Sequence, residues 1–348
     1  MVKKIDNIFN KKNRKIFVVA EMSANHSSNI KNAYKIIDQA KNIGVDAIKI
    51  QLYKANKITI NSKKKDFKIK NLNWKKYNNL YNLYKKAETP YAWYDNLKRY
   101  CSKKKIILFS SVFDLETVDF LEKKNCPIYK IASPEITDIP LLAKVAKTRK
   151  PIIISTGLAT EKDLDLAIKT LKKNKCKKIV VLKCTSSYPA ATEELNLSAI
   201  KKIKKKYKTI VGFSDHSLDK IAPSVAISLG AKVIEKHINL EKNVKSVDNF
   251  FSMNIPDFKE MIKNIRETEK MLGNEKIKIS KSSKKNLAGR KSLYVIKDIN
   301  KNDTFTKYNI SSIRPSYGLH PKFFNFILGK KSKKKLKFGQ RMKLSFVK

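Results

Sequence analysis

The stretch Ile210-Val-Gly-Phe-Ser-Asp-His216 begins with the apolar run Ile210–Phe213 and ends in a histidine. The stretch Lys232-Val-Ile-Glu-Lys-His237 likewise begins with the run Lys232–Ile234 and ends in a histidine. Both runs are short and rich in β-branched residues, which is typical of buried strands, and the interval between them leaves room for one helix. Six further runs lie at Ile16–Ala20, Ala47–Leu52, Ile106–Phe109, Ile128–Ile131, Ile152–Ile154 and Ile179–Leu182. Eight strands, each followed by a helix, predict an α/β fold with a closed parallel TIM (β/α)8 barrel.

The intervals between the runs support this prediction. Apolar residues recur with helical spacing, for example at Ala33, Ile36, Ile37 and Ala40. An open doubly wound sheet is the alternative arrangement, but no Gly-x-Gly-x-x-Gly motif follows the first run. The long segment Tyr53–Pro90 is rich in Tyr and Asn, and we expect it to be an elaborated connection that shapes a pocket.

The pattern changes near the C-terminal end. Residues 1–275 predict the TIM-barrel catalytic domain, residues 276–290 a polar linker, and residues 291–348 a small, mostly-β domain. Short strands are predicted at Ser292–Ile296 and Phe305-Thr306. A domain of about 60 residues is marginal alone, so we expect it to pack against another surface.

The composition limits the classes of function. The net charge of +47 could indicate a nucleic-acid or anionic-membrane partner. However, the lysines are scattered along the whole chain without interleaved aromatics, and abundant Lys, Asn and Ile with scarce Arg are typical of an AT-rich genome. We therefore expect no specific nucleic acid and no membrane as a partner.

The same composition predicts a cytoplasmic location. No segment approaches the roughly 20 consecutive apolar residues that span a bilayer, and the first residues lack the apolar region of a signal peptide. The four cysteines form no Cys-x-x-Cys pair, which favours reduced thiols.

Polar residues collect at the predicted C-terminal strand ends, where barrels of this type build their active sites. In chain order the ends deliver Glu21; Lys49 and Gln51; Ser110 and Ser111; Lys130, Ser133 and Glu135; Ser155; Lys183, Ser186 and Tyr188; Ser214 and His216; and Glu235 and His237. A lysine buried in an apolar strand needs an anionic partner. Lys49 and Lys130, with the nearby hydroxyl groups, therefore predict a site for a compact polyanion.

His216 and His237 lie at the ends of neighbouring strands and predict a divalent metal site, with Glu21 or Glu235 and water completing the ligands. Mixed nitrogen and oxygen ligation suits Mn, Zn, Co or Fe, and Mg less well. We take Mn, Co and Mg as the candidate cofactors. His26 and His320 are not assigned as ligands.

The combined motifs resemble the sialic acid synthase family, whose members condense phosphoenolpyruvate with an N-acetylated amino sugar to form nonulosonic acids. The resemblance covers nearly the whole chain from Ile16 onward, and the tail from about Ser292 resembles the family's antifreeze-like SAF (β-clip) domain. The matching stretches are Ala20-Glu-Met-Ser-Ala-Asn-His26, Asp46-Ala-Ile-Lys-Ile-Gln51, Tyr129-Lys-Ile-Ala-Ser133, Ile154-Ser-Thr-Gly157, Lys183-Cys-Thr-Ser-Ser-Tyr-Pro189, Gly212-Phe-Ser-Asp-His216 and Ile234-Glu-Lys-His237.

Four further stretches most resemble the branch of this family that makes pseudaminic acid from 2,4-diacetamido-2,4,6-trideoxy-L-altrose. They are Leu80-Tyr-Asn-Leu-Tyr84, Thr89-Pro90, Ile136-Thr-Asp-Ile-Pro140 and Arg314-Pro-Ser-Tyr-Gly-Leu-His-Pro321. N-acetylneuraminate and legionaminate synthases share the core motifs and remain alternatives.

The resemblance also implies roles for individual residues. Phosphoenolpyruvate would be held by Lys49, Lys130, Ser133, Ser155, Ser186 and Ser214. The metal would be held by His216 and His237, and the open-chain sugar would be surrounded by Glu21, Gln51, Tyr188, Glu235 and Asp248. Glu21 or Glu235 would position water or move protons, so the catalytic group is Glu21, Glu235, His216 and His237. Arg314 would reach the sugar in a partner subunit, which implies a domain-swapped homodimer.

Two positions depart from the family pattern. Lys245-Ser-Val-Asp248 stands where members usually carry Gly-Gly-Pro-Asp, and the loss of two glycines and a proline changes the backbone allowed to this loop. Asn300-Lys-Asn302 replaces a Lys-Lys-Gly turn. We expect the second change to be mild because asparagine tolerates the left-handed conformation.

Two other classes of function remain open. A barrel aldolase would use Lys49 or Lys130 as a Schiff base. A basic nucleic-acid or membrane module would bind with steep salt dependence, but it gives no reason for polar residues at eight strand ends. Ice binding by the tail has no support in a segment without repeats.

Overall fold

The computed structural model describes residues 2–10, 13–241, 245–274 and 276–348. The chain divides into two compact units, Met1–Gly273 and Asn274–Lys348. Among the described residues, every helix is too short or too polar to cross a bilayer.

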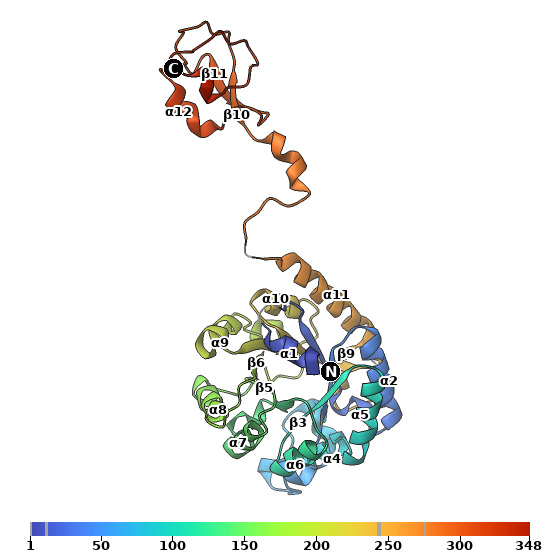
Figure 1. Ribbon diagram of the computed structural model, residues 1–348. Helices are drawn as coiled ribbons and strands as arrows, with labels where there is room; N and C mark the ends of the chain where they lie inside the picture. Colours follow the sequence, from blue (N-terminus) through green and yellow to red (C-terminus); the bar gives the residue numbers. More distant parts are fainter. Residues whose placement is uncertain (1, 11–12, 242–244, 275) are drawn as a thin grey trace. The chain divides into compact units, whose positions relative to one another are not determined.

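The first unit is a closed barrel of eight parallel strands surrounded by helices (Figure 1). The strands are β1 (Phe17–Glu21), β2 (Ala47–Gln51), β3 (Ile107–Ser111), β4 (Tyr129–Ile131), β5 (Ile152–Ser155), β6 (Ile179–Cys184), β7 (Ile210–Asp215) and β8 (Val233–Asn239). Each strand pairs with the next in chain order, and β1 pairs with β8, which closes the ring. This arrangement confirms the predicted TIM barrel and excludes the open sheet.

The strands are almost entirely buried, as expected for a parallel sheet that is covered on both faces. Every residue of β1, β3 and β8 is buried. The predicted runs locate the strands within a few residues, except that β8 continues to Asn239, well beyond the apolar run that ends at Ile234. The charged residues in this extension interrupt the apolar pattern, so the sequence did not predict this part of the strand. Their ion-pair partners are identified only by the fold. A short strand, β9 (Met253–Asn254), pairs with the end of β8.

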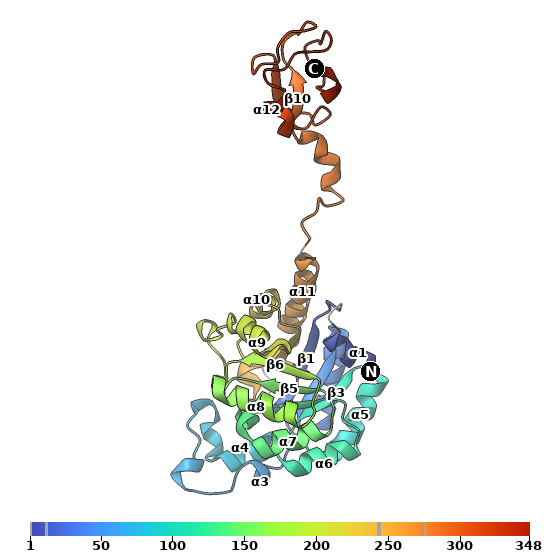
Figure 2. The same cartoon turned by 60° about the vertical axis from the view of Figure 1, so that its left-hand side comes forward.

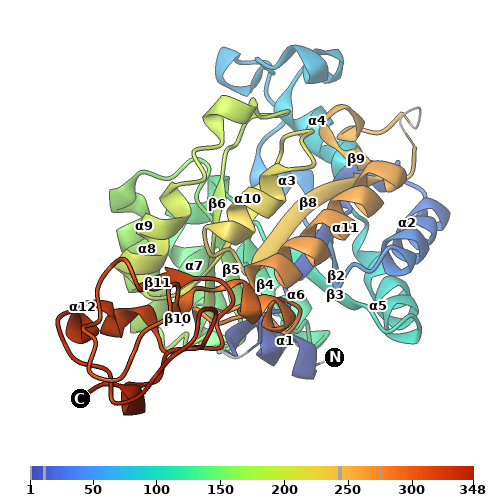
Figure 3. The same ribbon diagram turned by 90° about the horizontal axis from the view of Figure 1, so that it is seen from above.

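The outer layer contains α2 (Ile30–Asn42), α5 (Tyr94–Lys103), α6 (Leu115–Lys123), α7 (Ile139–Lys147), α8 (Glu161–Lys173), α9 (Ala199–Tyr207), α10 (Ala222–Ser228) and α11 (Ile255–Leu272). Figure 3 shows α10 beside α11 on this layer. In α8, Thr160 and Asp163 form a reciprocal capping box, which satisfies free N–H groups at the helix start. Leu164 and Leu171 point from α8 into the core.

The long connection between β2 and α5 contains five short elements and extends beyond the barrel (Figure 2). They are α3 (Ala55–Ile58), η2 (Lys65–Phe67), η3 (Leu72–Tyr77) and α4 (Leu80–Ala87), and a turn of 3-10 helix, η4 (Tyr91–Trp93), leads into α5. His26 ties the connection to β1, because its Nε2 lies 3.1 Å from Thr89 Oγ1. An additional N-terminal helix, α1 (Val2–Phe9), was not predicted, and its Ile5 and Ile8 join the barrel core.

The second unit has a small core of its own. Its antiparallel pair is β10 (Ser292–Val295) and β11 (Ile310–Ile313), accompanied by η8 (Ser283–Gly289), η9 (Pro321–Phe323), α12 (Phe324–Ile327) and η10 (Leu344–Phe346). Leu293, Val295, Phe305 and Leu336 belong to the buried cluster. Ser292–Ile296 was therefore correctly predicted as a strand.

Two predictions for the second unit have different outcomes. The predicted strand at Phe305-Thr306 is wrong, because Phe305 is a core residue in a turn-rich segment. The strand that is present, β11, was not predicted. The prediction for Asn302 is confirmed: this residue adopts a φ of 74°, the left-handed conformation in which asparagine replaces glycine at low cost.

Candidate active site

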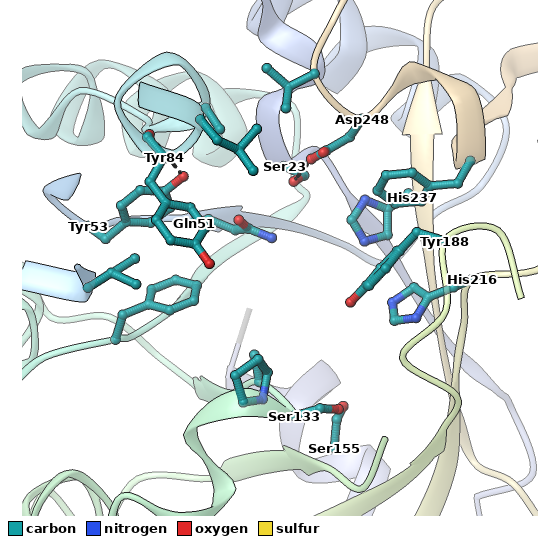
Figure 4. Close-up of a pocket in the computed structure, with 18 of the residues that line it drawn as sticks. Ser23, Gln51, Tyr53, Tyr84, Ser133, Ser155, Tyr188, His216, His237 and Asp248 are labelled. Atoms are coloured by element: carbon teal, nitrogen blue, oxygen red, sulfur yellow. Dashed lines mark hydrogen bonds between the residues drawn. The ribbon is translucent and has the colours of Figure 1, made fainter. Parts of the chain in front are cut away.

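The C-terminal ends of the strands surround one cavity of about 560 Å³. Strand pairing places Glu21 beside Lys49 and His237, and places Ser214 beside Glu235. Figure 4 shows His216, His237 and Tyr188 on one side of this cavity, with Gln51, Tyr53 and Tyr84 across from them. Residues far apart in the sequence therefore meet where the strand-end pattern predicted.

Four charged side chains form a cluster at the base of the cavity. Lys130 Nζ donates to Glu235 Oε1 at 2.9 Å, and Lys49 Nζ lies 3.4 Å from the same oxygen. Lys49 also forms an ion pair with Glu21 and donates to Ser111 Oγ at 3.1 Å. None of these four charged residues is more than 3% exposed. The anionic partners that the buried lysines require are therefore glutamates of the protein itself.

The two carboxylates of the cluster differ in their pKa. Burial opposes ionisation of Glu235, but the ammonium groups of Lys130 and Lys49 outweigh it and lower the pKa of Glu235 to about 2. Burial raises the pKa of Glu21 to about 7, although Lys49 opposes the rise, and the charge of Glu235 adds to it. Near pH 7 Glu21 can therefore hold a proton, which leaves one excess positive charge in the cluster and favours an anion.

Hydroxyl groups surround this base. Ser133, Ser155 and Ser214 line the cavity, and Ser214 Oγ donates to Glu235 Oε1 at 3.2 Å. Ser155 Oγ is buried and has no hydrogen-bond partner among the described residues. A buried hydroxyl normally finds a partner, so this atom is available to a bound ligand.

Gly157 shows how closely the loops after β5 and β6 approach each other. Its N–H donates to Ser133 Oγ at 2.9 Å. A Cβ atom at this position would lie 2.1 Å from Ser186 Oγ and 2.9 Å from Ser133 Oγ. Only glycine fits here without moving the two serines.

The two predicted imidazoles lie side by side, with ring centroids 5.4 Å apart. His216 Nδ1 lies 2.9 Å from Thr185 O, where it can donate its proton and leave Nε2 for a ligand. His237 Nδ1 is buried without a hydrogen-bond partner among the described residues. Burial and the neighbouring positive charges lower the pKa of His237 well below its usual value, which keeps the ring neutral as metal binding requires.

These features fit a divalent cation. The unpartnered nitrogen of His237 and the oriented ring of His216 could supply two ligands, and the unpartnered Glu235 Oε2 is buried nearby in the cluster. Within the described ranges, no group of three or more His, Cys, Asp or Glu side chains forms a complete ligand set. Water or substrate oxygen atoms would therefore have to supply the remaining ligands.

A second buried ion pair lies on the outward face of the same strands. Lys236 Nζ pairs with Asp215 and donates to Ser217 O at 2.6 Å. Asp215 Oδ1 accepts from the N–H and the hydroxyl of Ser217, at 2.9 and 2.7 Å. Because Lys236 and Asp215 directly adjoin His237 and His216 in the chain, this pair fixes the alignment of the two histidines.

Most of the predicted substrate residues line this single cavity. They are Lys49, Gln51, Lys130, Ser133, Ser155, Tyr188, Ser214, His216, Glu235, His237 and Asp248. Glu21 contributes through its ion pair with Lys49, and Ser186 packs beside Gly157. Arg314 is exposed in the second unit.

The altered loop retains its carboxylate at the cavity. Asp248 is buried, accepts a hydrogen bond from Ser23 Oγ, and lines the cavity next to Val247. Val244, which precedes the altered segment Lys245–Asp248, lies outside the described residues. The change of loop sequence has therefore not removed Asp248 from the site.

Sequence reasoning did not identify the aromatic and apolar walls of the cavity. Trp74, Phe113 and Phe251 line it together with Ile58, Ile69 and Leu80. These residues come largely from the connection between β2 and α5, where no strand periodicity indicates which side chains face inward. The richness of this segment in Tyr was the only available signal.

Glu135 provides a test of this description, because burial raises its pKa to about 7 and its Oε2 has no hydrogen-bond partner among the described residues. A raised carboxyl pKa contributes stability that is complete below the unfolded pKa of 4.5 and is lost as the pH rises through about 7. We expect Glu135→Gln to match the wild type near pH 4.5 and to exceed its free energy of unfolding by on the order of 2 kcal/mol at pH 8. Urea unfolding at both pH values measures this difference.

The exposed Glu193 on the loop after β6 provides the matched control. Glu193→Gln changes only an exposed side chain and should alter the free energy of unfolding by less than about 0.5 kcal/mol. Parallel curves for Glu135→Gln and the wild type would show that Glu135 titrates normally.

Comparisons with known proteins show which proteins this chain resembles. A model of the NeuB family matches residues 36–277. A pseudaminic acid synthase from Campylobacter jejuni subsp. jejuni serotype O:2 is 44% identical over 330 residues, covering 95% of this chain and 96% of that protein. A pseudaminic acid synthase from Helicobacter pylori is 41% identical and covers 92% of this chain and 94% of its own length.

A solved structure extends the comparison to the fold. The spore coat polysaccharide biosynthesis protein SpsE from Bacillus subtilis superposes with a TM-score of 0.64 and 30% sequence identity. The match covers 96% of this chain and 95% of that chain. The similarity therefore includes both units of the molecule.

Proposed function

The chain belongs to the NeuB family and is an enzyme, and from this premise we propose that it acts as a pseudaminic acid synthase. In this reaction phosphoenolpyruvate condenses with 2,4-diacetamido-2,4,6-trideoxy-L-altrose and water to give pseudaminic acid and phosphate. The observation that carries the proposal is the convergence of two buried lysines and two buried imidazoles on one cavity.

The lysine end of the cavity suits phosphoenolpyruvate. Lys49 and Lys130 would offset the charges of the phosphate and carboxylate groups, and the hydroxyls of Ser133, Ser155 and Ser214 would donate directional hydrogen bonds. Ser155 Oγ has no partner within the described chain, which supports this role. Ser186 would help by holding the backbone near Gly157.

The histidine side suits the sugar aldehyde. His216 and His237 would hold the metal, which when bound supplies Lewis-acid polarisation of the aldehyde at C1. Tyr188 stacks near His216, with ring centroids 4.5 Å apart, and would orient the open-chain sugar together with Gln51 and Asp248.

The bond changes follow from the two substrates. C3 of phosphoenolpyruvate forms a bond to C1 of the sugar, and the aldehyde oxygen takes up a proton. Water then adds to the electron-poor C2 and releases one proton, and phosphate leaves by cleavage of its bond to C2. Glu21 would exchange these protons because its pKa of about 7 allows both forms near neutral pH. Glu235, which stays ionised, would hold the two lysines in place.

Two parts of the proposal concern the assembled enzyme. We propose that Arg314 contacts the sugar from a partner subunit in a domain-swapped homodimer, because it is an exposed arginine on a compact unit with its own core. We also propose that the enzyme works in the cytoplasm, which is consistent with its four free cysteines.

A direct assay tests the reaction. We expect phosphate release from phosphoenolpyruvate with the L-altro diacetamido trideoxy sugar, and much slower release with its D-manno counterpart or with N-acetylmannosamine. A chelator should abolish the release, and mass spectrometry of the product should give the mass of pseudaminic acid. Preferred use of either other sugar would move the chain to a legionaminate or N-acetylneuraminate synthase.

A further inference from the structure

The walls of the cavity differ in chemical character. The side formed by the strand ends carries the charged cluster and the imidazoles, whereas the long connection between β2 and α5 contributes Ile58, Ile69, Trp74 and Leu80. Phe113, from the loop after β3, continues the apolar surface. Figure 4 shows Tyr53 and Tyr84, from the same connection, facing His216 and His237 across the cavity.

In this wall, the polar groups of Trp74 and Tyr53 form hydrogen bonds with backbone carbonyl groups of the protein. Trp74 Nε1 donates to Val247 O at 2.9 Å, and Tyr53 O–H donates to Tyr84 O at 3.3 Å. Their rings therefore present carbon to the cavity. Tyr53 also packs edge-on against Phe113, with centroids 5.0 Å apart.

Three other residues of the connection that line the cavity carry polar groups, and the first of them, Tyr84, has a phenol hydroxyl. Lys70 is exposed to solvent, and Asn71 Oδ1 accepts the N–H of Asn73 at 2.9 Å. The aromatic and aliphatic side chains thus dominate the enclosed part of the wall. A hydroxyl group pressed against them would lose water without gaining an equivalent hydrogen bond.

The direction of the sugar follows from the proposed function, on which this inference rests. An aldehyde at C1 beside the imidazoles directs the far end of the open chain, at C6, toward the opposite wall. We propose that the connection between β2 and α5 receives the C6 methyl group and makes the enzyme select a 6-deoxy sugar over the same sugar with a C6 hydroxyl. Ile69 and Leu80 are specificity-determining residues in this proposal.

A matched pair of substrates tests the selection. The pair is 2,4-diacetamido-2,4,6-trideoxy-L-altrose and 2,4-diacetamido-2,4-dideoxy-L-altrose, which differ only in the hydroxyl at C6. The wild-type enzyme should favour the 6-deoxy sugar by about 10- to 100-fold in kcat/KM, the range reached by an apolar pocket that meets an added hydroxyl. Phosphate release with saturating phosphoenolpyruvate measures both values.

Leu80→Asn is the informative variant, because asparagine has nearly the shape of leucine and offers a hydrogen-bond partner. Leu80 is half-buried at the start of α4, so the change does not open the core. The variant should lower kcat/KM for the 6-deoxy sugar, raise it for the 6-hydroxy sugar, and bring the ratio within about 3-fold. Leu72→Asn is the matched control, since Leu72 belongs to the same connection and is 78% exposed; it should keep the wild-type ratio.

The outcomes separate the two proposals. Equal kcat/KM for both sugars in the wild type would overturn the selection and leave the proposed function intact. An unchanged ratio in folded Leu80→Asn would also overturn it. No turnover of either sugar, with phosphate release from N-acetylmannosamine instead, would overturn the proposed function and the selection together.

Discussion

Lys130→Met is expected to lower kcat/KM for phosphoenolpyruvate by about 10³-fold, the effect of losing one preorganised charge in an enclosed site. The methionine keeps most of the length of the side chain and removes only the ammonium group, whose Nζ lies 2.9 Å from Glu235 Oε1. Glu235 keeps its second partner, Lys49, at 3.4 Å. Steady-state phosphate release with varied phosphoenolpyruvate measures the loss.

The variant should also lose stability, on the order of 3 kcal/mol, because Glu235 stays buried with only Lys49, which it shares with Glu21, as its partner; urea unfolding measures this loss separately from the rate. Lys144→Met is the matched control: Lys144 pairs with Asp119 on the surface at 2.6 Å, and its replacement should leave kcat/KM within about 2-fold. Borohydride trapping of substrate on wild-type Lys130, with loss of trapping in the variant, would instead establish a Schiff-base aldolase.

His237→Ala is expected to weaken the affinity for Mn²⁺ by more than about 100-fold, since even partners of metal ligands are worth 10- to 100-fold. It removes the buried ring whose Nδ1 has no hydrogen-bond partner among the described residues. Titration of the protein with Mn²⁺, followed by the spectroscopic signal of the free ion, gives the dissociation constant without an activity assay. Phosphate release should fall in parallel at limiting metal.

His320→Ala is the control for this experiment. His320 is exposed and caps the short helix η9 by accepting the N–H of Lys322 at 3.1 Å, so its loss should leave Mn²⁺ affinity unchanged. An unaltered affinity in His237→Ala with a large loss of rate would show that His237 moves protons and does not bind the metal.

The barrel was predictable because its strands are buried on both faces and therefore appear as uninterrupted apolar runs. The base of the active site was predictable for a related reason. Lys49 and Lys130 interrupt such runs, and a charge inside a buried strand requires a partner in the fold. Glu235, His216 and His237 were predicted to lie together because they follow neighbouring strands at the same end of the barrel.

The remaining parts depend on contacts between distant segments. Trp74 lines the cavity through a hydrogen bond to Val247 O, 173 residues away in the chain, and no local pattern indicates this contact. Phe305 was wrongly predicted to lie in a strand, because a short apolar pair in a turn-rich domain can equally fill a core. The partner of Lys236 was hidden because Asp215 lies on another strand.

The ion pair between Lys236 and Asp215 has a consequence for metal exchange. This ion pair lies on the outward face of β7 and β8 and links the two strands that carry the histidines. We therefore expect both imidazoles to keep their positions whether or not a metal ion is bound. We expect the protein to give up its ion to a chelator and take up a different one without refolding. The metal that occupies the proposed site would then depend on the supply of each metal.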